Sequence, residues 1–140
     1  MDLSNYGNID PDAPTVPNGK YKCIINKADE RRTNSGDGSY IALEFEVVEG
    51  TERGSRLWQN LNLVNPNPKA VQFAERDFAK IKRALGLTVV KHESEMLNIP
   101  FMIELKNYKK DGEWKQGLKY SSCADEAETI NEFSMDENIF

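Results

Sequence analysis

Alternation of apolar and polar side chains marks the clearest strands in this chain. In the segment 39–48, Ile41, Leu43, Phe45 and Val47 occupy every second position, which places them on one face of a strand. The segment 55–64 likewise carries three leucines on one face, and the turn 109–113 contains Asp-Gly, a common hairpin signal. The pattern predicts five strands, at residues 20–27, 39–48, 55–64, 99–108 and 114–122, with a polar loop at 29–38.

A helical repeat separates the third predicted strand from the fourth. After an Asn-Pro-Asn-Pro run, apolar residues recur at helical spacing between Lys69 and Leu85, and Gly86 follows at the position of a C-cap glycine. The apolar positions of this helix are Val71, Phe73, Ala74, Phe78, Ile81 and Leu85. Three strands, a helix and two strands is the order of the OB-fold, a five-stranded, partly open Greek-key barrel. The predicted fold class is therefore an all-β barrel of OB type with antiparallel strands, and a generic α+β sandwich is the alternative.

The length of 140 residues predicts one domain with terminal extensions. Residues 1–18 contain three prolines and three aspartates with little apolar periodicity, which predicts a flexible N-terminal arm. We expect the OB-fold domain to span residues 19–122. Residues 123–140 are predicted to form a disordered acidic C-terminal tail.

Charge is distributed unevenly along the chain, whose formal net charge is −5. Residues 1–120 hold 18 basic and 17 acidic side chains, whereas the last twenty residues hold six acidic and no basic ones. Without the acidic arm, residues 20–120 hold 18 basic and 14 acidic side chains, a net charge of +4. A mildly basic body with an acidic appendage favours nucleic acid or another polyanion as ligand, with the tail as regulator or docking element.

The residues needed for common catalytic and metal sites are scarce. His92 is the only histidine and lies in a polar loop with no cysteine nearby, and Cys23 and Cys123 lack the spacing of metal ligands. The sequence has neither a Walker glycine loop nor a dinucleotide fingerprint. We therefore predict a protein that is not an enzyme and that needs no cofactor or metal. The lack of a signal peptide and of a transmembrane run predicts a cytoplasmic protein with no membrane partner.

In an OB-fold, the ligand surface is the outward face of the second and third strands, flanked by two loops. Aromatic and basic residues combine at these places, and single-stranded nucleic acid needs both: rings stack on bases for roughly 1–3 kcal/mol each, while cations follow the phosphates. Trp58 could instead cap the end of the barrel, and Trp114 could belong to the core. The candidate nucleic-acid-binding residues are Tyr40, Arg56 and Trp58 on the strands, Arg31 and Arg32 in the first loop, and Tyr108, Lys109, Lys110 and Trp114 around the second.

The C-terminal segment combines acidic residues with an apolar end. Six carboxylates follow Ser121 with no basic residue among them, and the chain finishes on Ile-Phe. Such an end suits capture by another protein, with a pocket for the phenylalanine and basic residues for the carboxylates. An unstructured end without a partner is the alternative. The candidate partner-binding residues are Asp136, Glu137, Ile139 and Phe140.

Several runs of the body resemble a family of small phage proteins first catalogued as a domain of unknown function. These runs are PNGKY at 17–21, YIALEFEVVEG at 40–50, GSRLW at 54–58 and LNLVNPN at 61–67. The family is encoded among phage replication and recombination genes, and its members are taken to be OB-fold single-stranded DNA-binding proteins. The resemblance covers about residues 17–122 and implies the fold more directly than the activity, because its motifs are turns, strands and a helix entry.

The tail resembles the acidic, Phe-terminated tips through which bacterial and phage single-stranded DNA-binding proteins recruit replication and recombination proteins. It has fewer acids than the commonest bacterial form and carries Asn-Ile before the final Phe, where that form has Ile-Pro. The resemblance implies docking of partner proteins on this tip, and the departure from the bacterial form argues against the host's usual tail-binding pockets while a phage-encoded partner stays open.

Residues and resemblance together predict a sequence-independent single-stranded DNA-binding protein of a phage. It would protect single-stranded DNA during replication or recombination in the cytoplasm of the infected bacterium, and recruit partner proteins through its C-terminal tip. An exposed barrel edge could also pair two copies into a homo-oligomer. The alternative is an OB-fold protein–protein adaptor whose groove holds a peptide and that binds no nucleic acid, and a nuclease is disfavoured by the missing metal cluster.

Overall fold

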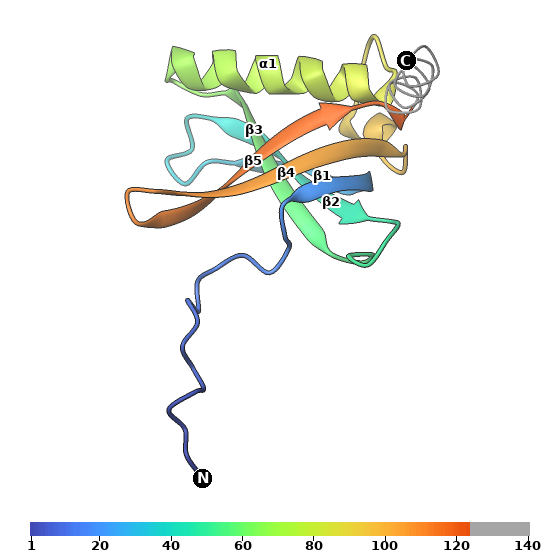
Figure 1. Ribbon diagram of the computed structural model, residues 1–140. Helices are drawn as coiled ribbons and strands as arrows, with labels where there is room; N and C mark the ends of the chain where they lie inside the picture. The colour runs from blue at the N-terminus through green and yellow to red at the C-terminus, as the bar shows by residue number, and fades with distance from the viewer. Residues whose placement is uncertain (124–140) are drawn as a thin grey trace, which may run out of the picture.

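Five antiparallel strands form a single sheet in the order β3-β2-β1-β4-β5. The computed structural model describes residues 1–123, and helix α1 lies across one end of the sheet (Figure 1). In chain order the elements are β1 (Gly19–Arg32), β2 (Ser39–Val47), β3 (Arg56–Val64), α1 (Pro68–Leu85), the short 3-10 helix η1 (Glu93–Met96), β4 (Phe101–Lys110) and β5 (Glu113–Ser121). The prediction of five antiparallel strands with one helix between the third and fourth is confirmed.

The ends of α1 follow from local sequence. Asn67 is the N-cap, and its side-chain oxygen accepts the backbone N–H of Lys69 at 3.0 Å. Pro68 occupies the first helical turn, where a missing N–H costs nothing. Gly86 closes the helix in the left-handed region, at φ 74°, as the sequence predicts.

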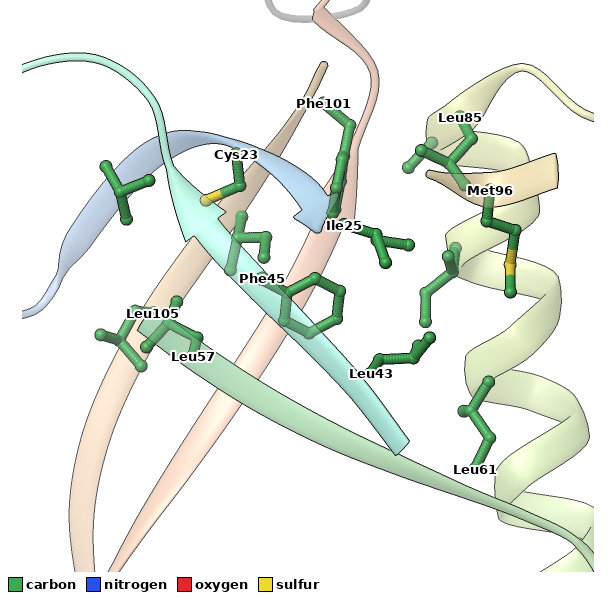
Figure 2. Close-up of a cluster of buried hydrophobic side chains, with 14 of the residues drawn as sticks. Cys23, Ile25, Leu43, Phe45, Leu57, Leu61, Leu85, Met96, Phe101 and Leu105 are labelled. Carbon is green, nitrogen blue, oxygen red and sulfur yellow. The ribbon is translucent and has the colours of Figure 1, made fainter. Parts of the chain in front are cut away.

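The core lies between the sheet and α1, and the strands supply most of it by alternation. The side chains of Leu43, Phe45 and Val47 in β2 are almost fully buried, whereas the residues between them are half-buried or face outward. Phe45 packs edge-on against Phe101 of β4, with ring centroids 5.8 Å apart. Figure 2 shows side chains from four strands converging on one space, with Leu85 and Met96 approaching from the helix side.

The sheet is curved but open. Strand β1 pairs with β4 through Gly19–Cys23 and with β2 through Cys23–Arg32, and the register shifts between Ile25 and Lys27. The edges of the sheet are β3 and β5, and α1 contacts both of them. A helix therefore occupies the opening between the two edge strands, and closure into a barrel stays a prediction.

Several predicted boundaries were wrong. Strand β1 runs to Arg32, so Arg31 and Arg32 lie in a strand and not in the loop 29–38. Strand β4 likewise extends to Lys110, which places Lys109 and Lys110 in the strand and not in the turn. Phe73 was counted on the buried face of the helix but is 60% exposed. The polar run at the end of β1 keeps strand conformation because it pairs with β2, a long-range effect that local polarity conceals.

Two close approaches position the chain around the sheet. Gly38 lies next to the end of β3, where an added Cβ would be 2.5 Å from the carbonyl oxygen of Val64. At the other side, the arm is anchored at Val16, which is buried and whose carbonyl accepts the Asn107 side-chain amide at 2.8 Å. The Asn18 side chain in turn accepts the backbone N–H of Asn107 at 2.8 Å. The end of the predicted arm is thus fastened to β4.

Candidate functional site

The outer face of β1, β2 and β3 carries a groove of about 330 Å³. Apart from the buried Leu43, its residues come from every second position of the three strands, because antiparallel partners directly opposite each other point to the same face. The register pairs Lys27 with Glu44 across β1 and β2, and Glu44 with Trp58 across β2 and β3. The lining residues are Lys27, Asp29, Arg31, Ala42, Leu43, Glu44, Trp58 and Asn60.

Trp58 is the largest exposed side chain of this groove, with 61% of its surface accessible. Its indole Nε1–H donates to Oε1 of Glu44 at 3.2 Å. The second oxygen of Glu44 accepts from Arg56 at 3.2 Å, and Arg56 also pairs with Glu46 at 3.3 Å. The indole is therefore held at its edge while its surface stays open to solvent, and the prediction that Trp58 faces outward is confirmed.

Glu44 connects the polar groups of this face. Burial raises the pKa of its carboxyl, but hydrogen bonds from Asn26 and Trp58 and the charges of Lys27 and Arg56 outweigh the burial, so its pKa lies below the usual value. The Glu44 side chain is only 19% exposed. An ionised carboxylate is therefore a fixed part of the groove wall.

The predicted residues at the end of β1 divide between the two faces of the sheet. Arg31 lines the groove, is opposite Tyr40 in the register and lies 3.7 Å from the carboxylate of Asp29. Tyr40 is half-buried on the same face. Arg32 is opposite Ser39, one position along, so its side chain leaves from the other face. Among the predicted residues, Arg31, Tyr40, Arg56 and Trp58 thus share one surface.

A second group of predicted residues lies on the β4–β5 hairpin. Asp111 and Gly112 form its turn with φ values of 54° and 78°, both in the left-handed region, and the hairpin that Asp-Gly predicted is confirmed. Lys109 is opposite Trp114, and its ammonium lies 5.4 Å from the centre of the indole ring. Tyr108 and Lys110 leave from the opposite face of the hairpin, by the same alternation.

The arm residue Asp10 completes the Lys109–Trp114 face. Its carboxylate accepts the indole Nε1–H of Trp114 at 2.9 Å and pairs with the Lys109 ammonium at 3.3 Å. The hydrogen bond from Trp114, with a second from the Asp12 backbone and the nearby Lys109 charge, lowers the pKa of Asp10 below its usual value. Trp114 is half-buried and belongs to this surface contact, so the alternative that placed it in the core was wrong.

In Figure 1 the β1–β2 turn and the β4–β5 hairpin extend to the same side of the domain. The sequence prediction missed Lys27, Glu44 and Asp10. The first two carry a detectable signal, since Lys27, Asp29 and Arg31 alternate as a strand would, and Glu44 alternates with Leu43 and Phe45 in the strand predicted at 39–48. Asp10 carries none, because its partner is 104 residues away.

Cys23 and His92, the residues with the most reactive side chains, both have structural roles. Burial raises the pKa of the Cys23 thiol to about 12, so it stays protonated at neutral pH. His92 caps η1, where its Nδ1 accepts the backbone N–H of Ser94 at 3.2 Å. Within residues 1–123, no three His, Cys, Asp or Glu side chains come together as metal ligands.

None of the helices in this part of the chain has the length and apolar character needed to span a bilayer. The predicted partner-binding residues Asp136, Glu137, Ile139 and Phe140 lie outside the described residues.

Comparison with known proteins identifies the family. The model of the family described as "Protein of unknown function (DUF669)" matches residues 4–127, so the chain belongs to the DUF669 family. No curated protein matches the chain. The family description assigns no activity, and the functional conclusion therefore depends on the two surfaces above.

Proposed function

We propose that this member of the DUF669 family binds single-stranded DNA without sequence preference, and that Trp58 is its main stacking platform. The observation that carries the proposal is the open indole of Trp58, 61% exposed at the rim of a groove and held at its edge by Glu44. Exposing so large an aromatic surface leaves its hydrophobic contribution unused in the fold. A nucleobase stacked on the ring would bury that surface for roughly 1–3 kcal/mol.

We further propose that the domain is an OB-fold. The supporting observations are the strand order and the two-part pairing of β1, which shares its first half with β4 and its second half with β2. The helix between β3 and β4 contacts both edge strands, where an OB barrel is partly open. On this assignment, the groove face of β2 and β3 and the neighbouring β1–β2 and β4–β5 connections are the surfaces that OB-folds use for oligonucleotides.

In the proposed mechanism, bases stack along the outer face while cations neutralise phosphates. Trp58 provides the first platform and Tyr40 the second, and Arg31 approaches the backbone from the end of β1. Lys109 and Lys110 approach the DNA backbone from opposite faces of the hairpin. Tyr108 and Trp114 also lie on opposite faces, so a single path of DNA would use one of them. Arg56 serves chiefly to hold the Glu44 carboxylate that orients Trp58.

The charges on the groove face predict how binding depends on salt. Three cations, Lys27, Arg31 and Arg56, share this face with three carboxylates, Asp29, Glu44 and Glu46. The groove is thus close to neutral, and stacking supplies more of its affinity than Coulomb attraction does. The salt-dependent part of the affinity would come from Lys109, Lys110 and the arginines at the end of β1.

The proposed biological role comes from the sequence resemblance to phage single-stranded DNA-binding proteins. The protein would cover single-stranded DNA during phage replication or recombination in the cytoplasm of the infected bacterium. Asp136, Glu137, Ile139 and Phe140 would then recruit a partner protein of the same process.

A fluorescence-anisotropy titration tests the proposal. Labelled oligo-dT is titrated with the full chain at low and at physiological salt, with matched duplex DNA and oligo-U as controls. Tight, salt-sensitive binding to oligo-dT with weak binding to the duplex is the expected result, and the oligo-U titration reports whether the ribose matters. Equal affinity for duplex and single strand, or no binding at low salt, would overturn the proposal. The second outcome would favour a peptide-binding adaptor.

A further inference from the structure

The N-terminal arm supplies a carboxylate to the one surface where the hairpin presents an indole N–H and an ammonium together. Asp10 bridges these two donors, at 2.9 Å to Trp114 and 3.3 Å to Lys109. An oxyanion is the natural partner of this donor pair, because both groups donate hydrogen bonds and one carries a positive charge. A phosphate oxygen offers the same chemistry as the carboxylate oxygen that occupies the position.

The surroundings of Asp10 leave room for a larger anion. A hollow of about 330 Å³ lies beside it, bordered by Lys109, Gly112 and Trp114 and by two carboxylates, Asp12 of the arm and Glu113, which pairs with Lys115 at 3.2 Å. The Asp10 side chain is 37% exposed and the Lys109 side chain 52% exposed. Solvent screens an ion pair this open, so replacing Asp10 by another oxyanion costs little free energy.

The arm is fastened separately from this contact. Val16 is buried, and its carbonyl and the Asn18 side chain are bonded to Asn107. Residues 1–10, in contrast, are all exposed. Asp10 can therefore leave the hairpin by a movement of the segment between it and Val16, while the fold and its anchor stay in place.

We propose that Lys109 and Trp114 form a phosphate-binding subsite for single-stranded DNA, and that Asp10 fills this subsite in the free protein until DNA displaces the arm. The inference rests on the proposed function and adds a competing element to it. DNA that binds the hairpin must break the Asp10 contact, and the free energy lost in doing so lowers the affinity for every single strand equally.

The substitution Asp10→Asn tests the inference, with Asp2→Asn as the matched control. Asp2 is an acidic residue of the same arm whose carboxylate accepts the backbone N–H of Ser4, two residues away. Both variants lose one negative charge, but only Asp10→Asn weakens the hairpin contact. We expect Asp10→Asn to bind oligo-dT about two- to five-fold more tightly at low salt, an advantage that shrinks as salt rises, and Asp2→Asn to match the wild type. Equal affinities of the two variants would overturn the inference.

A second readout follows the arm directly. The chain has two tryptophans, so the indole N–H region of an ¹H–¹⁵N spectrum contains two side-chain signals, which Trp114→Phe assigns. In the free protein, Asp10→Asn should shift the Trp114 signal and Asp2→Asn should not. Oligo-dT added to the wild type should shift the same signal. A Trp114 signal that does not shift in the Asp10→Asn variant, or does not shift when oligo-dT is added, contradicts the inference.

The outcomes separate the two proposals. Wild-type binding that depends on Trp58, with identical affinities for the Asp10→Asn and Asp2→Asn variants, removes the competing arm and leaves the proposed function. No binding of oligo-dT by the wild type or by either variant at low salt removes both.

Discussion

The groove face of β1–β3 and the Lys109–Trp114 face of the β4–β5 hairpin contain the same chemical groups but hold their carboxylates differently. Each has a tryptophan whose N–H donates to a carboxylate, Trp58 to Glu44 and Trp114 to Asp10. Glu44 belongs to β2, which is paired on both sides within the sheet. Asp10 belongs to an exposed arm outside the sheet.

This difference decides which carboxylate a ligand can replace. The backbone of Glu44 is held by the pairing of β2 on both sides, and Arg56 and Trp58 hold its carboxylate, so Glu44 stays part of the surface and orients the indole. Asp10 can leave by movement of the arm alone. The hairpin face is therefore the exchangeable part of the proposed interface, and the groove face is its preorganised part.

Removing the stacking ring tests the preorganised surface and should have the largest effect. Trp58→Ala is expected to weaken oligo-dT binding by about 1–3 kcal/mol, roughly 5- to 150-fold in Kd, because a stacking platform is lost. Phe73→Ala is the matched control, since Phe73 is a similarly exposed aromatic residue on α1. Anisotropy measures both affinities, and circular dichroism checks the fold. Equal losses in the two variants would remove the special role of Trp58.

Neutralising Glu44 tests whether the groove carboxylate is structural. Glu44→Gln keeps an oxygen that can accept from Trp58 but loses the charge that faces Arg56. We expect the free energy of unfolding at neutral pH to fall by about 1 kcal/mol, the typical net contribution of one hydrogen bond, because the bond from Arg56 to Glu44 loses its charge. Urea denaturation measures it, with Glu30→Gln at the exposed end of β1 as control. A Glu44→Gln variant as stable as the control would contradict the structural role.

The same variant has a defined pH dependence. Because the folded-state pKa of Glu44 lies below its value in the unfolded chain, the ionised carboxylate stabilises the fold. This contribution is fully present above the unfolded pKa of about 4.3 and is lost as the pH falls through the lower folded value. The stability difference between wild type and Glu44→Gln should therefore be constant near neutral pH and shrink in acid. A stability difference that grows as the pH falls would contradict a lowered folded-state pKa for Glu44.

Removing the acidic C-terminal segment tests electrostatic competition from a second source. Deletion of residues 124–140 removes six carboxylates and no basic residue. We expect oligo-dT binding to tighten several-fold at low salt, with the gain lost at high salt as the charges are screened. A chain of full length with the six acids changed to Asn or Gln separates charge from length. If the affinity for oligo-dT is unchanged in both the deletion and the neutralised chain, then Asp10 alone competes with DNA.

The smallest expected effect concerns the salt dependence of the hairpin. With about four phosphate contacts at about 0.7 each, log K should fall against log salt with a slope of roughly −2.8. Lys109→Ala should make this slope shallower by about 0.7, whereas Lys80→Ala, which removes an exposed lysine of α1, should leave it unchanged. Equal slopes in the two variants would remove Lys109 from the phosphate contacts.

Local features of the sequence were enough to predict the elements. The alternation around Phe45, the Asp111–Gly112 turn and the Gly86 cap each depend on neighbours within one strand, turn or helix, so their signal is contained in a short segment. Exposure of Trp58 was predicted for the same reason, because its position alternates with Leu57 in the strand.

The composition of the two surfaces depended on tertiary structure. The extension of β1 to Arg32 comes from pairing with β2, and the shift in register after Ile25 brings Lys27 opposite Glu44. The contact between Asp10 and Trp114 joins residues 104 positions apart. Hydrophobic periodicity reports which face of an element is buried, but pairing register and the path of an arm depend on groups distant in sequence. The sequence alone therefore identified the strands and the exposed aromatic residue, while tertiary structure decided which charges surround it and which carboxylate covers the hairpin.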